Sequence, residues 1–220
     1  MAKKEINLLG TYPKIKRDYE GRMKEKTPEI IKIAKQFGRE FFDGERKYGY
    51  GGYRYDGRWK SVVARFKEYY ILPDNAAILD VGCGKGFMLH DFKELMPNCT
   101  IAGIDVSEYA IENAMPDMRP FLKIASAEKL PYPDKSFDLV ISINSIHNLP
   151  PERLKTALKE IERVSRGNSY ITVDAWRNDQ EKENLIKWVL TAETMLQVDD
   201  WKKLFAEVGY TGDYWWFIAD

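Results

Sequence analysis

The sequence predicts a doubly wound α/β fold with a mostly parallel sheet of six or seven strands, preceded by a helical segment. From residue 78 onward, short apolar runs alternate with helical segments, as in strands joined by crossover helices. A glycine-rich turn follows the first of these runs, at the position where such folds bind ligands. The length of 220 residues allows one such domain and one appended segment. We expect residues 1–70 to form a helical and aromatic lid and residues 71–220 to form the ligand-binding domain.

The N-terminal part is predicted to contain two helices joined by a loop. Residues 27–42 are expected to form one helix, because Thr27 suits the N-cap, Pro28 suits the first turn and apolar residues follow at helical spacing. Residues 48–59 contain too many glycines for a helix and are expected to form an aromatic loop. A second helical stripe begins at Val62.

Apolar runs give the predicted strands of the parallel sheet, at residues 78–81, 100–104, 121–125, 137–143 and 170–173. The crossover helices are expected between them, at residues 87–96, 108–114 and 151–164. Two further helices are expected at 181–190 and 199–208. Residues 210–219 are rich in aromatic side chains and are predicted to form the last strand.

The composition is that of an ordinary globular protein and narrows the possible functions. Lys and Arg total 34, Asp and Glu total 34, and the net charge of zero does not favour a nucleic-acid partner. No apolar run reaches the roughly 18 residues of a membrane helix, and the N-terminus lacks a signal peptide, so we expect a cytoplasmic protein without a membrane partner. Two cysteines and two histidines show no zinc-site spacing, so no metal is expected, and the oligomeric state is left open.

Basic residues are concentrated at the start of the chain. The first 60 residues hold 16 Lys and Arg against 9 Asp and Glu, so the remainder is acidic. Such a segment either docks on its own acidic domain, is a solvated face, or contacts an anionic substrate as a lid.

The turn Asp80-Val-Gly-Cys-Gly-Lys-Gly86 predicts a nucleoside site. Its Gly-x-Gly-x-Gly spacing differs from the Gly-x-Gly-x-x-Gly fingerprint of dinucleotide-binding domains and from the phosphate-binding loop of nucleoside triphosphatases. Asp105 ends the second predicted strand, where a carboxylate can accept both hydroxyls of a ribose. Cys83 is interpreted as a small packing residue within the turn.

These features resemble the class I S-adenosylmethionine-dependent methyltransferases. The resemblance covers about residues 76–175 and includes Gly103-Ile-Asp105 and the run from Leu130 to Ile141. It implies a Rossmann-like fold, S-adenosylmethionine as the cofactor and a small-molecule substrate. It also implies a sheet that finishes with a sixth strand and an antiparallel seventh. The sequence after Asp199 offers one candidate strand only, so either this hairpin is shortened or one strand is misassigned.

The resemblance assigns the cofactor contacts. The glycine turn and Asp80 would face the amino-acid part of the cofactor, Asp105 its ribose, and the segment after the third strand its adenine. Asn144 falls where family members contact the cofactor, and the family often has Asp at the position of Ser126. The predicted cofactor-binding residues are Asp80, Gly82, Cys83, Gly84, Gly86, Asp105, Val106, Ser126, Ala127, Glu128 and Asn144.

The acceptor side has fewer signals. Methyl transfer mainly requires positioning, but a hydroxyl or ammonium nucleophile must lose a proton, which a base of pKa near 7 accepts best. His147, just beyond the fourth strand, is the predicted catalytic residue, as base or substrate orienter, and a capping or packing role is the alternative. Asp174 could orient the substrate or His147, or be a solvated strand end. The loop's tyrosines and arginines could donate to a carboxylate or phosphate, or could pack between helices. The predicted substrate-binding residues are Tyr50, Tyr53, Arg54, Tyr55, Arg58 and Asp174.

The sequence thus predicts transfer of a methyl group from S-adenosylmethionine to an O or N atom of a small polar or anionic metabolite. An aminopropyl transferase or a reductase on the same sheet remains an alternative. A cofactor-binding regulatory or partner subunit without transfer activity is another. The acceptor is not identified, because acceptor pockets are built from variable loops.

Overall fold

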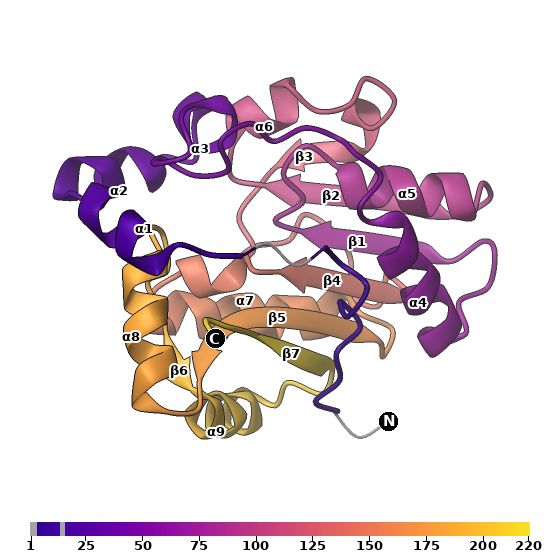
Figure 1. Ribbon diagram of the computed structural model, residues 1–220. Coiled ribbons are helices and arrows are strands. Elements are labelled where there is room, and N and C mark those ends of the chain that lie inside the picture. The colour runs from indigo at the N-terminus through magenta and orange to yellow at the C-terminus, as the bar shows by residue number, and fades with distance from the viewer. Residues whose placement is uncertain (1–3, 14–15) are drawn as a thin grey trace.

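A sheet of seven strands, in which every strand pair is parallel, forms the centre of the computed structural model, which describes residues 4–13 and 16–220 (Figure 1). Residues 1–3 and 14–15 of the expected lid segment lie outside the described residues. The strand order is β3-β2-β1-β4-β5-β6, and β7 also pairs with β5. The strands are β1 (Ala77–Val81), β2 (Thr100–Asp105), β3 (Leu122–Ile124), β4 (Leu139–Ile143), β5 (Ser169–Trp176), β6 (Leu196–Gln197) and β7 (Asp213–Ile218).

Helices cover both faces of this sheet, which confirms the predicted doubly wound fold. One apolar cluster packs α4 and α5 on the sheet, and a second packs α7 and α9 on it (Figure 1). Five helices have the predicted positions to within a few residues, and α6 is shorter than expected. The helices of this part are α4 (Lys60–Tyr70), α5 (Phe87–Leu95), α6 (Glu108–Glu112), α7 (Pro151–Val164), α8 (Asp179–Trp188) and α9 (Val198–Val208).

The order of winding reverses at β1. The chain adds β2 and β3 on one side of β1, and then adds β4 and β5 on the other. Ligands of doubly wound sheets bind in the crevice that this reversal opens at the carboxyl ends of the strands. The glycine turn after β1 and Asn144 after β4 both lie at that crevice.

The N-terminal segment differs from the prediction. The single helix expected over 27–42 is two helices, α2 (Pro28–Ala34) and α3 (Arg39–Asp43). The break occurs because Phe37 takes a left-handed conformation with φ of 49°, and Gly38 then caps α3. Helix α1 (Tyr19–Glu25) was not predicted, because it buries one residue only and its sequence shows no apolar stripe.

The end of the sheet also corrects an expectation. The resemblance implied an antiparallel seventh strand, whereas β7 runs parallel to β5 from Asp213 opposite Tyr170 to Ile218 opposite Ala175. Helix α9 connects β6 to β7 as a crossover, so β7 runs in the same direction as β6 and β5.

The start of the chain lies along β7. The Ile6 N–H donates to the Tyr214 carbonyl at 3.0 Å, and the Tyr214 N–H donates to the Lys4 carbonyl at 3.0 Å. The Trp216 indole N–H donates to Glu5 at 2.8 Å. The N-terminal segment is therefore attached to the domain at its beginning as well as through α4 at its end. Over the part of the chain that is described, no helix has the length and apolar character needed to cross a lipid bilayer.

Candidate functional site

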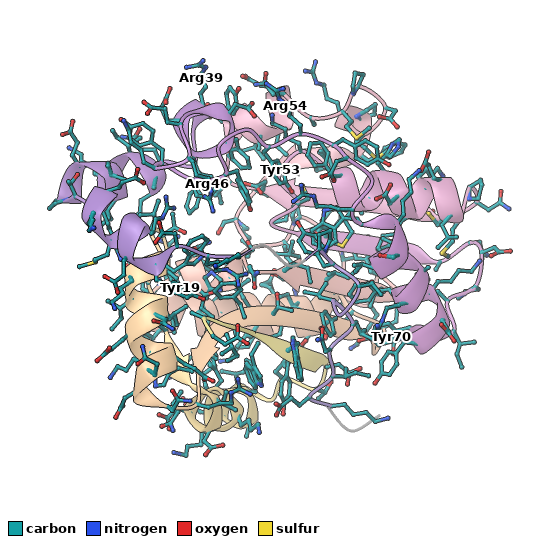
Figure 2. The ribbon with its side chains drawn as sticks, viewed as in Figure 1. Tyr19, Arg39, Arg46, Tyr53, Arg54 and Tyr70 are labelled. Atoms are coloured by element: carbon teal, nitrogen blue, oxygen red, sulfur yellow. The ribbon has the colours of Figure 1, made fainter. Side chains whose placement is uncertain are left out.

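A cavity of about 1160 Å³ opens over the carboxyl ends of β1, β2, β4 and β5. Gly82, Asp105, Asn144 and Asp174 line it from the sheet. The N-terminal segment contributes further lining residues, and Figure 2 shows Tyr53 and Arg46 directed toward the interior, below the ribbon of α3. Segments far apart in the sequence therefore enclose one space.

The glycine turn is fixed by close contacts. Gly82 has a φ of 85°, and a Cβ there would lie 2.0 Å from the Ser145 hydroxyl oxygen. No other residue fits this position without moving the segment after β4. A Cβ on Gly84 would lie 3.2 Å from the Tyr53 ring, so the turn also meets the N-terminal segment closely.

Three of the predicted cofactor residues, Asp80, Cys83 and Gly86, belong to the turn or the strand before it and do not line the cavity. Gly86 is the left-handed N-cap of α5, with φ of 78°. The Cys83 thiol is buried and packs beside Gly103, whose Cβ, if present, would lie 2.8 Å from the sulfur. Cys83 thus has the packing environment expected from the sequence.

Asp105 is held in one orientation by backbone donors. One carboxylate oxygen accepts the Gly84 N–H at 2.8 Å, and the other accepts the Ser107 N–H at 2.9 Å. Burial raises the pKa of Asp105, and these hydrogen bonds oppose the shift. Each carboxylate oxygen retains a further lone pair, so the group can accept two more hydrogen bonds from a ligand.

Asp80 is a buried carboxyl group for which the described residues show no side-chain hydrogen bond. Burial, with a smaller contribution from the charge of Asp105, raises the pKa of Asp80 to about 8. Buried carboxylates are costly without a donor or a cation, so this position suits a ligand ammonium group.

The remaining predicted cofactor residues are divided between the cavity and its surroundings. Asn144 lines the cavity, and its amide oxygen accepts a hydrogen bond from the Thr172 hydroxyl at 2.8 Å, which leaves the amide NH₂ for a ligand. Val106, Ser126 and Ala127 also line it. Glu128 does not, because it is held in an ion pair with Arg153.

His147 and Asp174 form a buried pair at the cavity wall. His147 Nδ1 accepts the Asp174 backbone N–H at 3.2 Å, and Nε2 lies 3.5 Å from an Asp174 carboxylate oxygen. Burial lowers the pKa of His147, and the charge of Asp174 opposes this. Burial raises the pKa of Asp174, and the charges of His147 and Arg17 oppose that shift. The neutral imidazole therefore carries its proton on Nε2, facing Asp174, and its lone pair is already engaged.

The aromatic loop is not brought to the cavity as a whole. Tyr50, Tyr53 and Arg58 line it, but Arg58 is paired with Asp56, whose carboxylate lies 2.8 Å from Nε. Arg54 is exposed to solvent, and Tyr55 is directed at α5, so neither lines the cavity.

Asp43, the last residue of α3, attaches the N-terminal segment to the glycine turn. Its carboxylate accepts hydrogen bonds from Lys85 at 2.6 Å, from the Tyr109 hydroxyl at 2.7 Å and from the Tyr53 N–H at 3.1 Å. Burial raises the pKa of Asp43, but the donors Lys85 and Tyr109 outweigh it and hold the pKa below its ordinary value. The Ser107 hydroxyl adds a bond to the Phe37 carbonyl at 2.5 Å.

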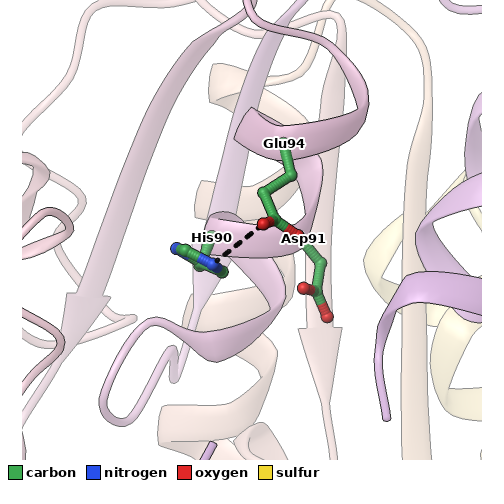
Figure 3. Close-up of side chains that lie close together, drawn as sticks. All are labelled: His90, Asp91 and Glu94. Carbon is green, nitrogen blue, oxygen red and sulfur yellow. Dashed lines mark ion pairs between the residues drawn. The ribbon is translucent and has the colours of Figure 1, made fainter. Parts of the chain in front are cut away.

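A second group of titratable side chains lies on α5, outside the cavity. Figure 3 shows His90, Asp91 and Glu94 close together on α5. Their ligand atoms lie within 4.8 Å of one another. Each also has another partner: His90 contacts Asp117, Glu94 pairs with Lys60, and Asp91 accepts the Tyr55 hydroxyl. We therefore assign the group to the attachment of the aromatic loop to α5.

Four of the lining residues that were not predicted from the sequence form a group of their own. Arg17, Arg22, Arg46 and Trp188 meet at the end of the cavity formed by α1 and α8. The only signal for them in the sequence is the basic surplus of the first 60 residues.

A glycine turn at the reversal of winding, followed by an acidic residue at the end of the neighbouring strand, defines a nucleoside-binding α/β domain. Residues 78–168 match the family model described as a methyltransferase domain. Over these residues the chain is similar to the class I methyltransferases.

Its relatives have different acceptors. The chain is 33% identical over 146 residues to a tRNA (carboxymethyluridine(34)-5-O)-methyltransferase of Arabidopsis thaliana, which covers 66% of this chain and 34% of that protein. It is 30% identical over 159 residues to a sterol 4-C-methyltransferase of Caenorhabditis elegans, which covers 69% of this chain and 46% of that protein. The chain thus spans about a third to a half of the length of these curated relatives.

The solved structure of the YcgJ protein of Bacillus subtilis shares the fold. It superposes with a TM-score of 0.55 at 18% identity and covers 66% of both chains.

Proposed function

We propose that this chain transfers a methyl group from S-adenosylmethionine to an O or N atom of a small polar or anionic acceptor. The observation that carries the proposal is the continuity of the cavity. It joins the glycine turn, Asp105 and Asn144 at one end to His147 and Asp174 at the other. Residues 1–70 would act as the lid and residues 71–220 as the methyltransferase domain.

The residues present fit the cofactor. When bound, S-adenosylmethionine would supply an electrophilic methyl group on a sulfonium. Asp80 would accept its ammonium group, because this carboxyl is buried and has no other partner among the described side chains. Asp105 would accept the ribose hydroxyls with its remaining lone pairs, and Ser126 and Ala127 would lie against the adenine.

Binding of S-adenosylhomocysteine is expected to release a proton from Asp80. With a pKa of about 8, Asp80 is mostly protonated at pH 7, and a ligand ammonium group stabilises the ionised form. Affinity should therefore rise with pH up to about pH 8 and then level off. Calorimetry in buffers of different ionisation enthalpy measures the proton release. Asp80→Asn should abolish it, and equal release by that variant would contradict the assignment.

Asp174 would act as the proton acceptor for the methyl acceptor, with His147 as its positioning residue. The His147 lone pair is engaged by a backbone N–H, whereas the one polar contact of the Asp174 carboxylate among the described side chains is the long one to Nε2. A carboxyl group whose pKa is raised by burial is better matched to proton transfer near neutral pH than an ordinary one.

The acceptor can be identified by labelling. A cell extract incubated with methyl-labelled cofactor and the protein is separated into small molecules, RNA and protein. We expect the label among the small molecules, and no transfer with Asp105→Ala as the matched control. Label in RNA, as for the tRNA-modifying relative, or in protein would contradict a small-molecule acceptor. Cofactor binding without any labelled product would favour a regulatory subunit.

A further inference from the structure

Three guanidinium groups gather around one indole ring at the end of the cavity away from the glycine turn. Arg17, Arg22 and Arg46 have their guanidinium carbons 5.6, 5.6 and 5.2 Å from the centroid of a Trp188 ring. Arg17 also lies 4.5 Å from the centroid of the Phe217 ring. We call Arg17, Arg22 and Arg46 the arginine cluster.

The cluster is anchored by groups that do not neutralise it. Arg22 is buried and donates to the carbonyls of Arg46 at 2.8 Å, Lys47 at 3.1 Å and Trp188 at 3.4 Å. Arg46 donates to the Gly49 carbonyl. These bonds fix the guanidinium groups of Arg22 and Arg46, but a carbonyl oxygen carries no countercharge.

Two carboxylates of the N-terminal segment are paired elsewhere, whereas Asp174 and Asp220 line the same cavity without an ion pair to any of the three arginines. Glu20 pairs with Lys187 and Glu45 with Lys47. The charge of Glu25 reaches Arg22 and Arg46 but is the weakest of the influences on both. Among the described residues, no ion pair joins a carboxylate to any of the three arginines.

Placing like charges together in a partly dry site is unfavourable. Burial, and after it the charge of Arg46, lowers the pKa of Arg22 to about 10. Partial desolvation, and after it the charge of Arg17, lowers the pKa of Arg46, whose side chain is exposed overall. Such an arrangement produces a positive potential in the cavity, which an anion would relieve.

The cluster lies on the acceptor side of the cavity. Trp188 ends α8 and Phe217 belongs to β7, next to β5, whereas the residues that would hold the cofactor come from β1, β2, β4 and the segment after β3. The charge of Arg17 acts on Asp174, the proposed proton acceptor. An anionic group held here would place the rest of a small acceptor beside Asp174.

We infer that the arginine cluster binds an anionic group, a carboxylate or a phosphate, of the methyl acceptor. Arg17 and Arg46 would contact it, because Arg22 is buried, has its Nε and Nη1 donors engaged by carbonyls and acts as a positioning residue. The flat guanidinium groups suit the paired oxygens of either anion. This inference rests on the proposed function, since it names the substrate class of the same site.

The test uses inorganic phosphate and succinate as probes. Each is titrated calorimetrically into the full chain, with and without saturating S-adenosylhomocysteine. The wild type should bind at least one probe, and sodium chloride should weaken the binding. Arg17→Gln and Arg46→Gln should each raise the dissociation constant about tenfold or more, because each loses a charge-assisted hydrogen bond. Tighter binding of phosphate or of succinate identifies which anion the site prefers.

The controls separate this inference from the proposed function. Arg54→Gln removes an exposed arginine of the same segment and should leave probe binding unchanged. All variants should keep the wild-type affinity for S-adenosylhomocysteine and the wild-type circular dichroism. The Trp188 indole N–H signal, assigned with Trp188→Phe, should shift when the probe binds.

Two results would overturn the inference: failure of the wild type to bind either probe, or equal binding by the wild type and the Arg17→Gln/Arg46→Gln double variant. Failure to bind S-adenosylhomocysteine would instead overturn the proposed function. The titrations of phosphate and succinate without that ligand would still show whether the arginine cluster binds an anion.

Discussion

Asp105→Ala is expected to weaken the binding of S-adenosylhomocysteine about 100-fold or more, because two hydrogen bonds to a charged acceptor contribute about 1.5–3 kcal/mol each. The substitution also releases the Gly84 and Ser107 N–H groups that the carboxylate holds. The turn would then lose a constraint on its shape. Calorimetry on the wild type and the variant measures the change.

The controls address folding and charge. Asp200→Ala removes a carboxylate on α9, far from the cavity lining, and should leave the affinity unchanged. Asp105→Asn keeps the shape and one acceptor oxygen, so its affinity should be intermediate. Wild-type affinity in a folded Asp105→Ala protein would remove the basis for a nucleoside site at the end of β2.

Asp174→Asn is expected to lower kcat about 100-fold or more, because general base catalysis typically contributes 10² to 10⁴. The affinity for S-adenosylhomocysteine should be kept. The carboxyl group must be ionised to accept a proton, so the wild-type rate should rise with pH through the raised pKa of Asp174 and then level off. The variant should lack this rise. Turnover of the acceptor found by labelling, measured across pH, provides the readout.

His147→Gln distinguishes a positioning residue from a base. His147 lowers the pKa of Asp174 when it is protonated, and in the neutral form it still directs its Nε2 proton at the carboxylate, so its removal should move the rise in rate to higher pH while the rise itself remains. Loss of the rise in His147→Gln, together with its retention in Asp174→Asn, would reverse the two roles.

The parallel sheet could be predicted because its strands are short apolar runs buried on both faces, a pattern that depends on neighbouring residues only. The β1 run has four buried residues of five, and the β5 run has seven of eight. Helix α1 and the two-residue strand β6 escaped prediction because contacts with distant segments stabilise them. The break at Phe37 escaped because a left-handed phenylalanine has no sequence signature.

The cofactor end of the site could be predicted because its residues follow a local sequence pattern, and the acceptor end could not because its residues come from distant segments. The predicted cofactor residues follow the ends of successive strands in a fixed order, and seven of the eleven line the cavity. The arginine cluster joins Arg17 to Trp188 across most of the chain, so no spacing can reveal it. The basic residues of the first 60 positions have different surroundings. Lys35 pairs with Glu193 of the domain, whereas the arginine cluster lines the cavity.

Arg58 illustrates a signal that was present but not used. It was expected to offer free donors to a substrate, yet Asp56, two residues earlier, already neutralises it. A carboxylate at that separation in a tight turn is within reach of the guanidinium. In contrast, nothing adjacent to Arg46 in the sequence indicates that its charge would be left without a paired carboxylate.

The attachments of the N-terminal segment constrain how a ligand could enter. The N-terminal segment is attached at three places. Ile6 is hydrogen-bonded to β7, α4 packs on the sheet, and Asp43 in between pairs with Lys85. In the proposed lid role, the segment could not open by a rigid-body hinge motion about one end, because both of its ends are attached to the domain. Exchange of the spent cofactor would then require the part of the segment around Asp43 to move away from the cavity, which breaks the three hydrogen bonds of this carboxylate. The rate of that opening would be an upper limit on kcat.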